Sequence, residues 1–129
     1  MYAFSTTTSK SYDEAVAAVK DALQEQGFGV LTEINVSAVL KNKLDIDKRP
    51  YIILGACNPV LANQAMEAEP DIGLLLPCNV VVREEEDGSV TVAFMDPSAV
   101  LALVDNPSVP ALATEVRGRL KKVCDAIAS

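Results

Sequence analysis

Two apolar runs of this chain end in the same kind of junction, in which Asn or Asp is followed directly by proline. The run from Tyr51 to Ala56 is too short for a helix, and Asn58-Pro59 comes soon after it. The alternating apolar residues within 90–94 are followed by Asp96-Pro97. Asn and Asp are favoured at the N-cap of a helix, and proline is favoured at its first position. Each junction therefore predicts a strand that ends where a helix begins.

Capping residues and the spacing of apolar side chains predict the other helices. Ser11-Tyr12-Asp13-Glu14 is a capping box that starts a helix over 12–26, and Gly27 is the expected stop. Ser37 is the expected cap of a short helix, and a long amphipathic helix covers 112–127. The two shorter helices have predicted apolar sides made of Val39, Leu40 and Leu44, and of Leu61, Ala62, Ala65 and Met66.

Alternation and turn residues predict the remaining strands. A Thr-rich strand covers 2–8, and Asp87-Gly88 marks a hairpin. The apolar stretch 72–82 is interrupted by Pro77, where a bulge or a strand edge is expected. In the strand over 28–36 one face is expected to be buried, consisting of Phe28, Val30, Thr32, Ile34 and Val36. We predict an α+β fold for residues 1–129, a single compact domain with helices packed on one side of a mainly antiparallel sheet.

Composition excludes several classes of protein. The net charge of −7 disfavours nucleic-acid binding, and no apolar stretch reaches the ~18–20 residues of a membrane span. Half of the residues are hydrophobic and Trp is absent, so the core is expected to be aliphatic. The chain has no histidine, which rules out a Ser–His–Asp triad, a Cys–His dyad and a histidine zinc site within it. Three cysteines and a polar N-terminal segment favour a reducing cytoplasm.

The strongest candidates for a site are two turns that each place a cysteine beside an asparagine, Cys57-Asn58-Pro59 and Cys78-Asn79. Cys57 precedes a helix N-cap, where the helix dipole is expected to lower a thiol pKa. If the two apolar runs are neighbouring strands, the two thiols meet at one end of the sheet. A shared site and a simple packing role remain equally open, whereas Cys124 on the last helix is expected to pack in the core.

Other candidate residues carry weaker signals. Glu33 is expected to be exposed, or else to face a pocket with Lys41 as an acid/base pair. Asp96 is expected to cap a helix. A four-ligand zinc site is not supported, because no Cys-x-x-Cys motif is present. A metal held by the thiolates of Cys57 and Cys78 with carboxylate or exogenous ligands remains open, and no cofactor is identified.

Several sequence blocks together resemble one family. They are Gly27-Phe28 through Glu33, Arg49-Pro50-Tyr51, Gly55-Ala56-Cys57-Asn58-Pro59, Gly73-Leu74-Leu75-Leu76-Pro77-Cys78-Asn79-Val80 and Asp96-Pro97. The chain resembles, over nearly its whole length, the bacterial and archaeal domain-of-unknown-function family numbered 302. The resemblance implies a compact α+β domain that forms a homodimer, with no established reaction. Its signature positions here are Cys57, Asn58, Pro59, Pro77 and Cys78, with Glu33 as a further position.

Three functions are compatible with these observations. The leading hypothesis is a cytoplasmic domain that binds a small anionic or sulfur-containing ligand, or a metal, at Cys57 and Cys78, with Asn58 orienting the site. The second is a thiol–disulfide or sulfur-transfer enzyme with Cys57 as the attacking thiol and Cys78 as the resolving thiol. The third is a structural module that pairs with a second copy through an apolar sheet or helix face.

Overall fold

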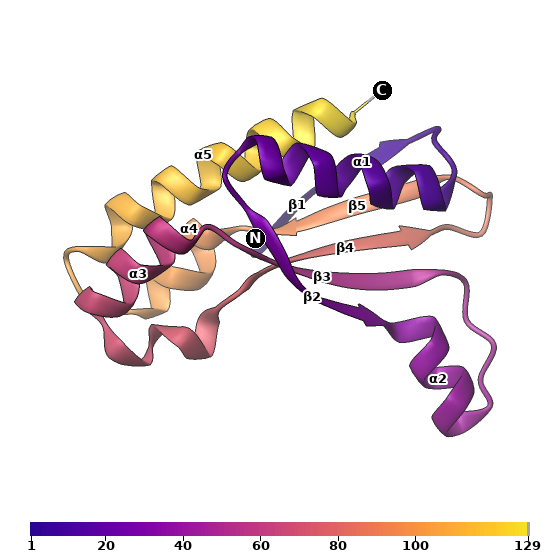
Figure 1. Cartoon of the computed structure of the whole chain (residues 1–129), viewed down its shortest axis with the longest axis horizontal. Helices are drawn as coiled ribbons and strands as arrows, with labels where there is room; N and C mark the ends of the chain where they lie inside the picture. Colours follow the sequence, from indigo (N-terminus) through magenta and orange to yellow (C-terminus); the bar gives the residue numbers. More distant parts are fainter. Residues whose placement is uncertain (129) are drawn as a thin grey trace.

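The computed structural model describes residues 1–128 and contains a five-stranded antiparallel sheet (Figure 1). The strand order across the sheet is β1-β5-β4-β3-β2, and every neighbouring pair is antiparallel. The strands are β1 (Ala3–Thr8), β2 (Gly29–Asn35), β3 (Tyr51–Cys57), β4 (Cys78–Glu84) and β5 (Val90–Met95). β4 is therefore the central strand, and β1 and β2 are the two edges.

Helices cover one face of this sheet. α1 (Tyr12–Glu25) and α5 (Val109–Ile127) lie side by side across it, whereas α2 (Val36–Leu44) projects from one end of the molecule (Figure 1). The opposite end holds α3 (Pro59–Ala68), α4 (Pro97–Val100) and the 3-10 helices η1 (Pro70–Leu75) and η2 (Leu101–Leu103). The predicted α+β class, with helices on one side of an antiparallel sheet, is confirmed. Within residues 1–128, no helix combines the length and the apolar character needed to cross a bilayer.

The predicted caps start three helices. At α1, the Glu14 amide donates to Ser11 Oγ at 3.2 Å and the Ser11 amide donates to Glu14 Oε1 at 3.1 Å. At α3, the Leu61 amide donates to Asn58 Oδ1 at 3.1 Å, and at α4 the Ser98 amide donates to Asp96 Oδ1 at 3.0 Å. Both Asx-Pro junctions therefore join a strand to a helix, as the sequence predicts.

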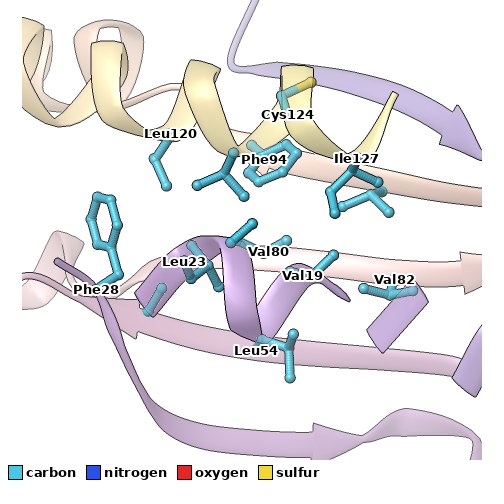
Figure 2. Close-up of a cluster of buried hydrophobic side chains, with 14 of the residues drawn as sticks. Val19, Leu23, Phe28, Leu54, Val80, Val82, Phe94, Leu120, Cys124 and Ile127 are labelled. Carbon is cyan, nitrogen blue, oxygen red and sulfur yellow. The ribbon is translucent and has the colours of Figure 1, made fainter. Parts of the chain in front are cut away.

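The core is aliphatic apart from two phenylalanines, and it fills the space between the helices and the sheet. Figure 2 shows side chains from α1 and α5 facing those from β3, β4 and β5. Phe94 is fully buried at its centre and stacks on Phe4 of the edge strand, with ring centroids 5.4 Å apart. The side chains that share this core with Phe94 include Val19, Leu23, Leu54, Val80, Val82, Leu120 and Ile127.

The prediction of one buried face on 28–36 is wrong for most of that strand. β2 is an edge strand, and a bulge shifts its register between Val30 and Thr32. After the bulge, Glu33 pairs with Leu54 on the helix side, while Thr32 and Ile34 lie on the opposite face. An extra residue in one strand reverses the faces of all residues that follow it, which is why strict alternation failed here.

Four smaller predictions also need correction. The cap of α2 is Asn35, whose Oδ1 accepts the Ala38 amide, and Ser37 instead accepts the Tyr51 amide. None of the residues of α2 is buried, because this helix lies beyond the end of the sheet. Met66 of α3 is exposed. Pro77 lies neither in a bulge nor on an edge strand as expected, because it precedes the central strand β4 and separates it from the 3-10 helix η1.

Candidate functional site

The structure brings Cys57 and Cys78 into one pocket. In the ladder between β3 and β4, Ala56 is the direct partner of Cys78, so Cys57 is one residue away from that pair. Both cysteines are free, and both are among the residues that line a cavity of about 30 Å³ at this end of the sheet. Cys78 is buried, with 6% of its surface exposed, whereas Cys57 is partly exposed.

The rest of the cavity wall is almost entirely apolar. Asn58 is the one further polar side chain, and its Oδ1 is already occupied by the Leu61 amide. The wall is contributed by α3, α5, the start of η2 and the segment before β4. Its apolar members are Phe28, Ala56, Leu61, Ala62, Ala65, Leu76, Pro77, Leu101, Leu112 and Val116.

Gly55 allows Pro77 to pack against β3 at the rim of this cavity. A Cβ atom at Gly55 would come within 2.9 Å of Pro77 Cγ and even closer to Thr32 Oγ1. Pro77 directly precedes β4, and its bond to Leu76 is a cis peptide. The absence of a side chain at Gly55 therefore fixes how closely the segment that carries Cys78 approaches β3.

The expected lowering of the Cys57 pKa is wrong. Burial raises the pKa of the Cys57 thiol, and it raises the pKa of Cys78 from 9.0 to about 11, with Cys57 as a second cause. The physical reason is that the apolar wall of the cavity excludes water from the thiols and offers no positive charge that would stabilise a thiolate. The start of α3 has few free donors, because Pro59 has no N–H and the Leu61 and Ala62 amides are bonded to Asn58. The two thiols are therefore neutral at physiological pH.

We expect the buried Cys78 thiol to make the protein less stable as the pH rises above 9. The unfolded chain loses this proton near the ordinary pKa of 9.0, whereas the folded chain keeps it up to about 11. Unfolding therefore releases a proton between these values, and the free energy of unfolding falls by on the order of 2 kcal/mol. Urea unfolding of the wild type and of Cys78→Ala at several pH values measures the difference. Identical pH slopes for the two proteins would contradict this assignment.

Three other candidate residues lie away from the cavity. Asn79 lies on the opposite face of β4, because successive residues of a strand alternate. Pro59 is exposed at the first position of α3. Glu33 is exposed, as the first of its two predicted settings has it, and is bonded to Lys20 at 3.0 Å, whereas Lys41 pairs with Asp45 and Asp47, so the alternative pairing of Glu33 with Lys41 does not form. These ion pairs are exposed and contribute little to stability.

Cys124 and Asp96 have the roles expected from the sequence. Cys124, labelled on α5 in Figure 2, is buried and belongs to the main core cluster. Asp96 caps α4 and also accepts a bond from Arg117 Nε at 3.1 Å. Among residues 1–128 no group of three or more His, Cys, Asp or Glu side chains is arranged to hold a metal ion. A metal at the thiol pocket would therefore have two protein ligands.

Sequence reasoning missed most of the wall. The spacing of apolar residues in 112–127 predicts that Leu112 and Val116 are buried but does not show that they line a pocket, and the same holds for Leu101 in the helical segment after Asp96-Pro97. The pocket forms where α5 crosses α3, and that crossing depends on tertiary packing. The apolar spacing of 112–127 is the sequence signal that indicates a wall-forming helix here.

Comparison with known proteins places this chain in a wider group. Residues 4–127 match the model of a family described as "Domain of unknown function DUF302". An uncharacterized protein of Aquifex aeolicus (strain VF5) is 27% identical over 85 residues, which make up 66% of this chain and 53% of that protein. The chain thus spans about half the length of this curated relative. The crystal structure of an uncharacterized conserved DUF302 protein from Bacillus stearothermophilus superimposes with a TM-score of 0.91, at 26% identity and 98% coverage of both chains.

Proposed function

Because the chain belongs to the DUF302 family, whose shared feature is a fold and not a known reaction, we propose a function from its pocket: the domain binds a small sulfur-containing ligand at Cys57 and Cys78. The observation that carries the proposal is that two free cysteines line one small, mostly apolar cavity. Soft, polarizable sulfur suits such a wall better than an anion does. The capped start of α3 and the neutral thiols also offer little to an anionic ligand.

The volume of the cavity limits the ligand to very few atoms. A protein cavity of about 150 Å³ accommodates benzene, which corresponds to roughly 25 Å³ per non-hydrogen atom. The cavity of about 30 Å³ here therefore holds one or two such atoms. Without a covalent bond to the protein, even the best ligands gain at most about 1.5 kcal/mol of binding free energy per non-hydrogen atom. A ligand of one or two atoms would therefore bind with a Kd weaker than about 1 mM. Stable retention requires a bond to a thiol.

A sulfane sulfur bonded to Cys57 Sγ is small enough for the cavity, and its covalent bond to the protein explains how so small a ligand is retained. Cys57 is the more exposed of the two thiols, so a persulfide donor R–S–SH reaches it first. The Cys57 sulfur attacks the terminal sulfur of the donor, the S–S bond of the donor breaks, and a new S–S bond forms on Cys57 Sγ. The proton of the Cys57 thiol goes to the departing R–S⁻, which leaves as R–SH. The raised pKa of Cys57 makes this loading slow at neutral pH and faster as the pH rises.

The test is loading with an inorganic polysulfide under anaerobic conditions, followed by removal of the donor and intact mass measurement. We expect the wild type to gain the mass of one sulfur atom and to lose it on reduction with dithiothreitol. Cys57→Ala should gain none, whereas Cys124→Ala is the matched control that removes a buried thiol outside the pocket and should load normally. Equal loading of Cys57→Ala and the wild type would refute the proposal.

Two other hypotheses receive less support. A soft metal ion would have to displace protons from thiols whose pKa values burial has raised, and it would find two ligands here. A thiol–disulfide enzyme needs rapid, repeated attack by a thiolate, and the raised pKa of Cys57 opposes such turnover at neutral pH more than it opposes the single slow loading step proposed here. Three free cysteines are consistent with a reducing compartment, so a cytoplasmic location is part of the proposal.

The expected homodimer remains a prediction, and we place its interface on the sheet face that no helix covers. One row of residues crosses all five strands there in register, formed by Ile34, Ile53, Val81, Ala93 and Ser5. A face of five strands covers roughly 24 Å by 20 Å, which is of the same order as the ~800 Å² that each partner buries in a standard interface. A second copy presents the same row, which is apolar except for Ser5, and matches it under two-fold symmetry.

Val81→Lys is expected to shift this equilibrium strongly toward the monomer, because it places a charge at the centre of the row. Light scattering coupled to size-exclusion chromatography over a range of concentrations measures the shift. Val60→Lys is the matched control, since Val60 is exposed on α3 and lies outside the open face of the sheet. A wild type that stays monomeric at high micromolar concentration would contradict the prediction.

A further inference from the structure

The end of the molecule that holds α3, η1, α4 and η2 has acidic side chains and no basic ones of its own. Residues 50–82 contain no Lys or Arg, and neither do residues 84–116. The carboxylates of Glu67, Glu69, Asp71 and Asp105 make no ion pair within residues 1–128. The negative charge at this end is thus left uncompensated by the chain itself.

Large apolar side chains are exposed between these carboxylates. Leu74 of η1 is 86% exposed and Leu103 of η2 is 79% exposed. Both belong to the wall of a hollow of about 310 Å³ between the two 3-10 helices. We call this feature the acidic hollow; its residues are Glu69, Asp71, Ile72, Leu74, Leu75, Leu103, Val104 and Asp105. Exposed leucines gathered in one hollow and rimmed by charge are typical of a protein-binding surface.

The base of the acidic hollow is held in place by packing and by a side-chain bridge. Ile72 is 1% exposed and packs with Leu101 and Val109 in a second hydrophobic cluster. Asn106 Nδ2 donates to the Ala68 carbonyl at 2.7 Å and to Glu69 Oε1 at 3.3 Å, which ties the loop after η2 to the end of α3. The hollow is therefore preformed, so little ordering is needed when a partner binds.

We propose that the acidic hollow docks an amphipathic helix of a partner protein whose apolar side chains enter between Leu74 and Leu103 and whose Lys or Arg residues meet Glu69, Asp71 and Asp105. Charge complementarity selects this partner. Nucleic acid and anionic lipid carry the same sign of charge as the rim and are repelled. The leucines supply the apolar contact of a helix-in-groove interface, and the unpaired carboxylates supply its polar rim.

The test uses a fluorescein-labelled synthetic helix of Leu and Lys residues, with the same sequence carrying Glu in place of Lys as the control peptide. Fluorescence anisotropy should show saturable binding of the Lys peptide to the wild type and none of the Glu peptide. Leu74→Ser/Leu103→Ser should weaken binding about tenfold or more, since apolar anchors dominate such interfaces. Asp71→Asn/Asp105→Asn should weaken binding at low salt and flatten its salt dependence.

Matched variants distinguish binding at the acidic hollow from general attraction of the Lys peptide by the net charge of −7. Leu31→Ser/Leu44→Ser removes two leucines of similar exposure elsewhere, and Asp21→Asn/Glu86→Gln removes two exposed charges elsewhere, so both should bind like the wild type. Three results would overturn the proposal: no binding of the Lys peptide, equal weakening by the matched variants, or a leucine variant that binds like the wild type. Self-association that the Leu74→Ser/Leu103→Ser change abolishes would identify the hollow as an interface between copies and would also overturn it.

Discussion

Replacing Phe94 with alanine is expected to lower the free energy of unfolding by about 3–5 kcal/mol, which is a large part of the stability of a domain of this size. Phe94 is fully buried between the sheet and α5, and its ring stacks on Phe4. Alanine would leave a cavity that the surrounding aliphatic side chains fill only in part. Urea unfolding followed by circular dichroism measures the change.

Phe94→Leu is the matched control, because it keeps most of the apolar volume and should cost far less than alanine does. The stacked Phe4 loses its partner in both variants. The difference between the two variants therefore reports the cavity, not the ring contact. A loss of under about 1 kcal/mol for Phe94→Ala would mean that Phe94 is not at the centre of the core.

Replacing Gly55 with alanine is expected to destabilise the protein by about 1–3 kcal/mol and to disturb the thiol pocket at the same time. The added methyl group would meet Thr32 Oγ1 and Pro77 Cγ, so either the edge strand β2 or the segment before β4 must move. Because Pro77 is part of the cavity wall, we also expect Cys78 to react faster with iodoacetamide in the folded protein.

Gly29→Ala is the control for the Gly55 variant. Gly29 lies on the neighbouring strand β2, and a Cβ atom there would have no other atom within 4 Å. We expect this variant to leave both the stability and the reactivity of Cys78 close to those of the wild type. If Gly55→Ala and Gly29→Ala behaved alike, the close approach of Pro77 to β3 would not be what positions Cys78.

The sequence was sufficient for features that depend on neighbouring residues. Asn58 and Asp96 were identified as caps because the cap and the amide that it accepts are two or three residues apart. The α+β class follows from the mixture of strand–helix and hairpin signals along the chain. Cys57 and Cys78 line one pocket, which the sequence predicts only on the condition that their two apolar runs are neighbouring strands, and β3 and β4 do pair.

Features that depend on distant residues could not be predicted in this way. The bulge in β2 is invisible in the alternation of 28–36, yet it moves Glu33 to the helix side and Ile34 to the open face. The shift of the Cys57 pKa is opposite to the predicted one because the apolar wall comes from Leu101, Leu112 and Val116, far along the chain. The sequence predicts that Asn58 caps α3. It does not show that this cap leaves few free backbone N–H donors for a ligand at the start of the helix.

The thiol pocket and the acidic hollow are built on the same two 3-10 helices. Leu101 of η2 and Leu76 after η1 line the pocket, while Leu103 of η2 and Leu75 of η1 line the hollow. A helix docked in the hollow would therefore contact the elements that also form part of the pocket wall.

Native mass spectrometry of protein purified anaerobically, without reductant or chelator, tests the pocket proposal most directly. We predict that the wild type and Cys124→Ala carry one additional sulfur atom, and that Cys57→Ala has the mass of its sequence alone. The same spectra report the oligomeric state of each protein. An unmodified wild type, or an additional sulfur that persists in Cys57→Ala, would contradict the account.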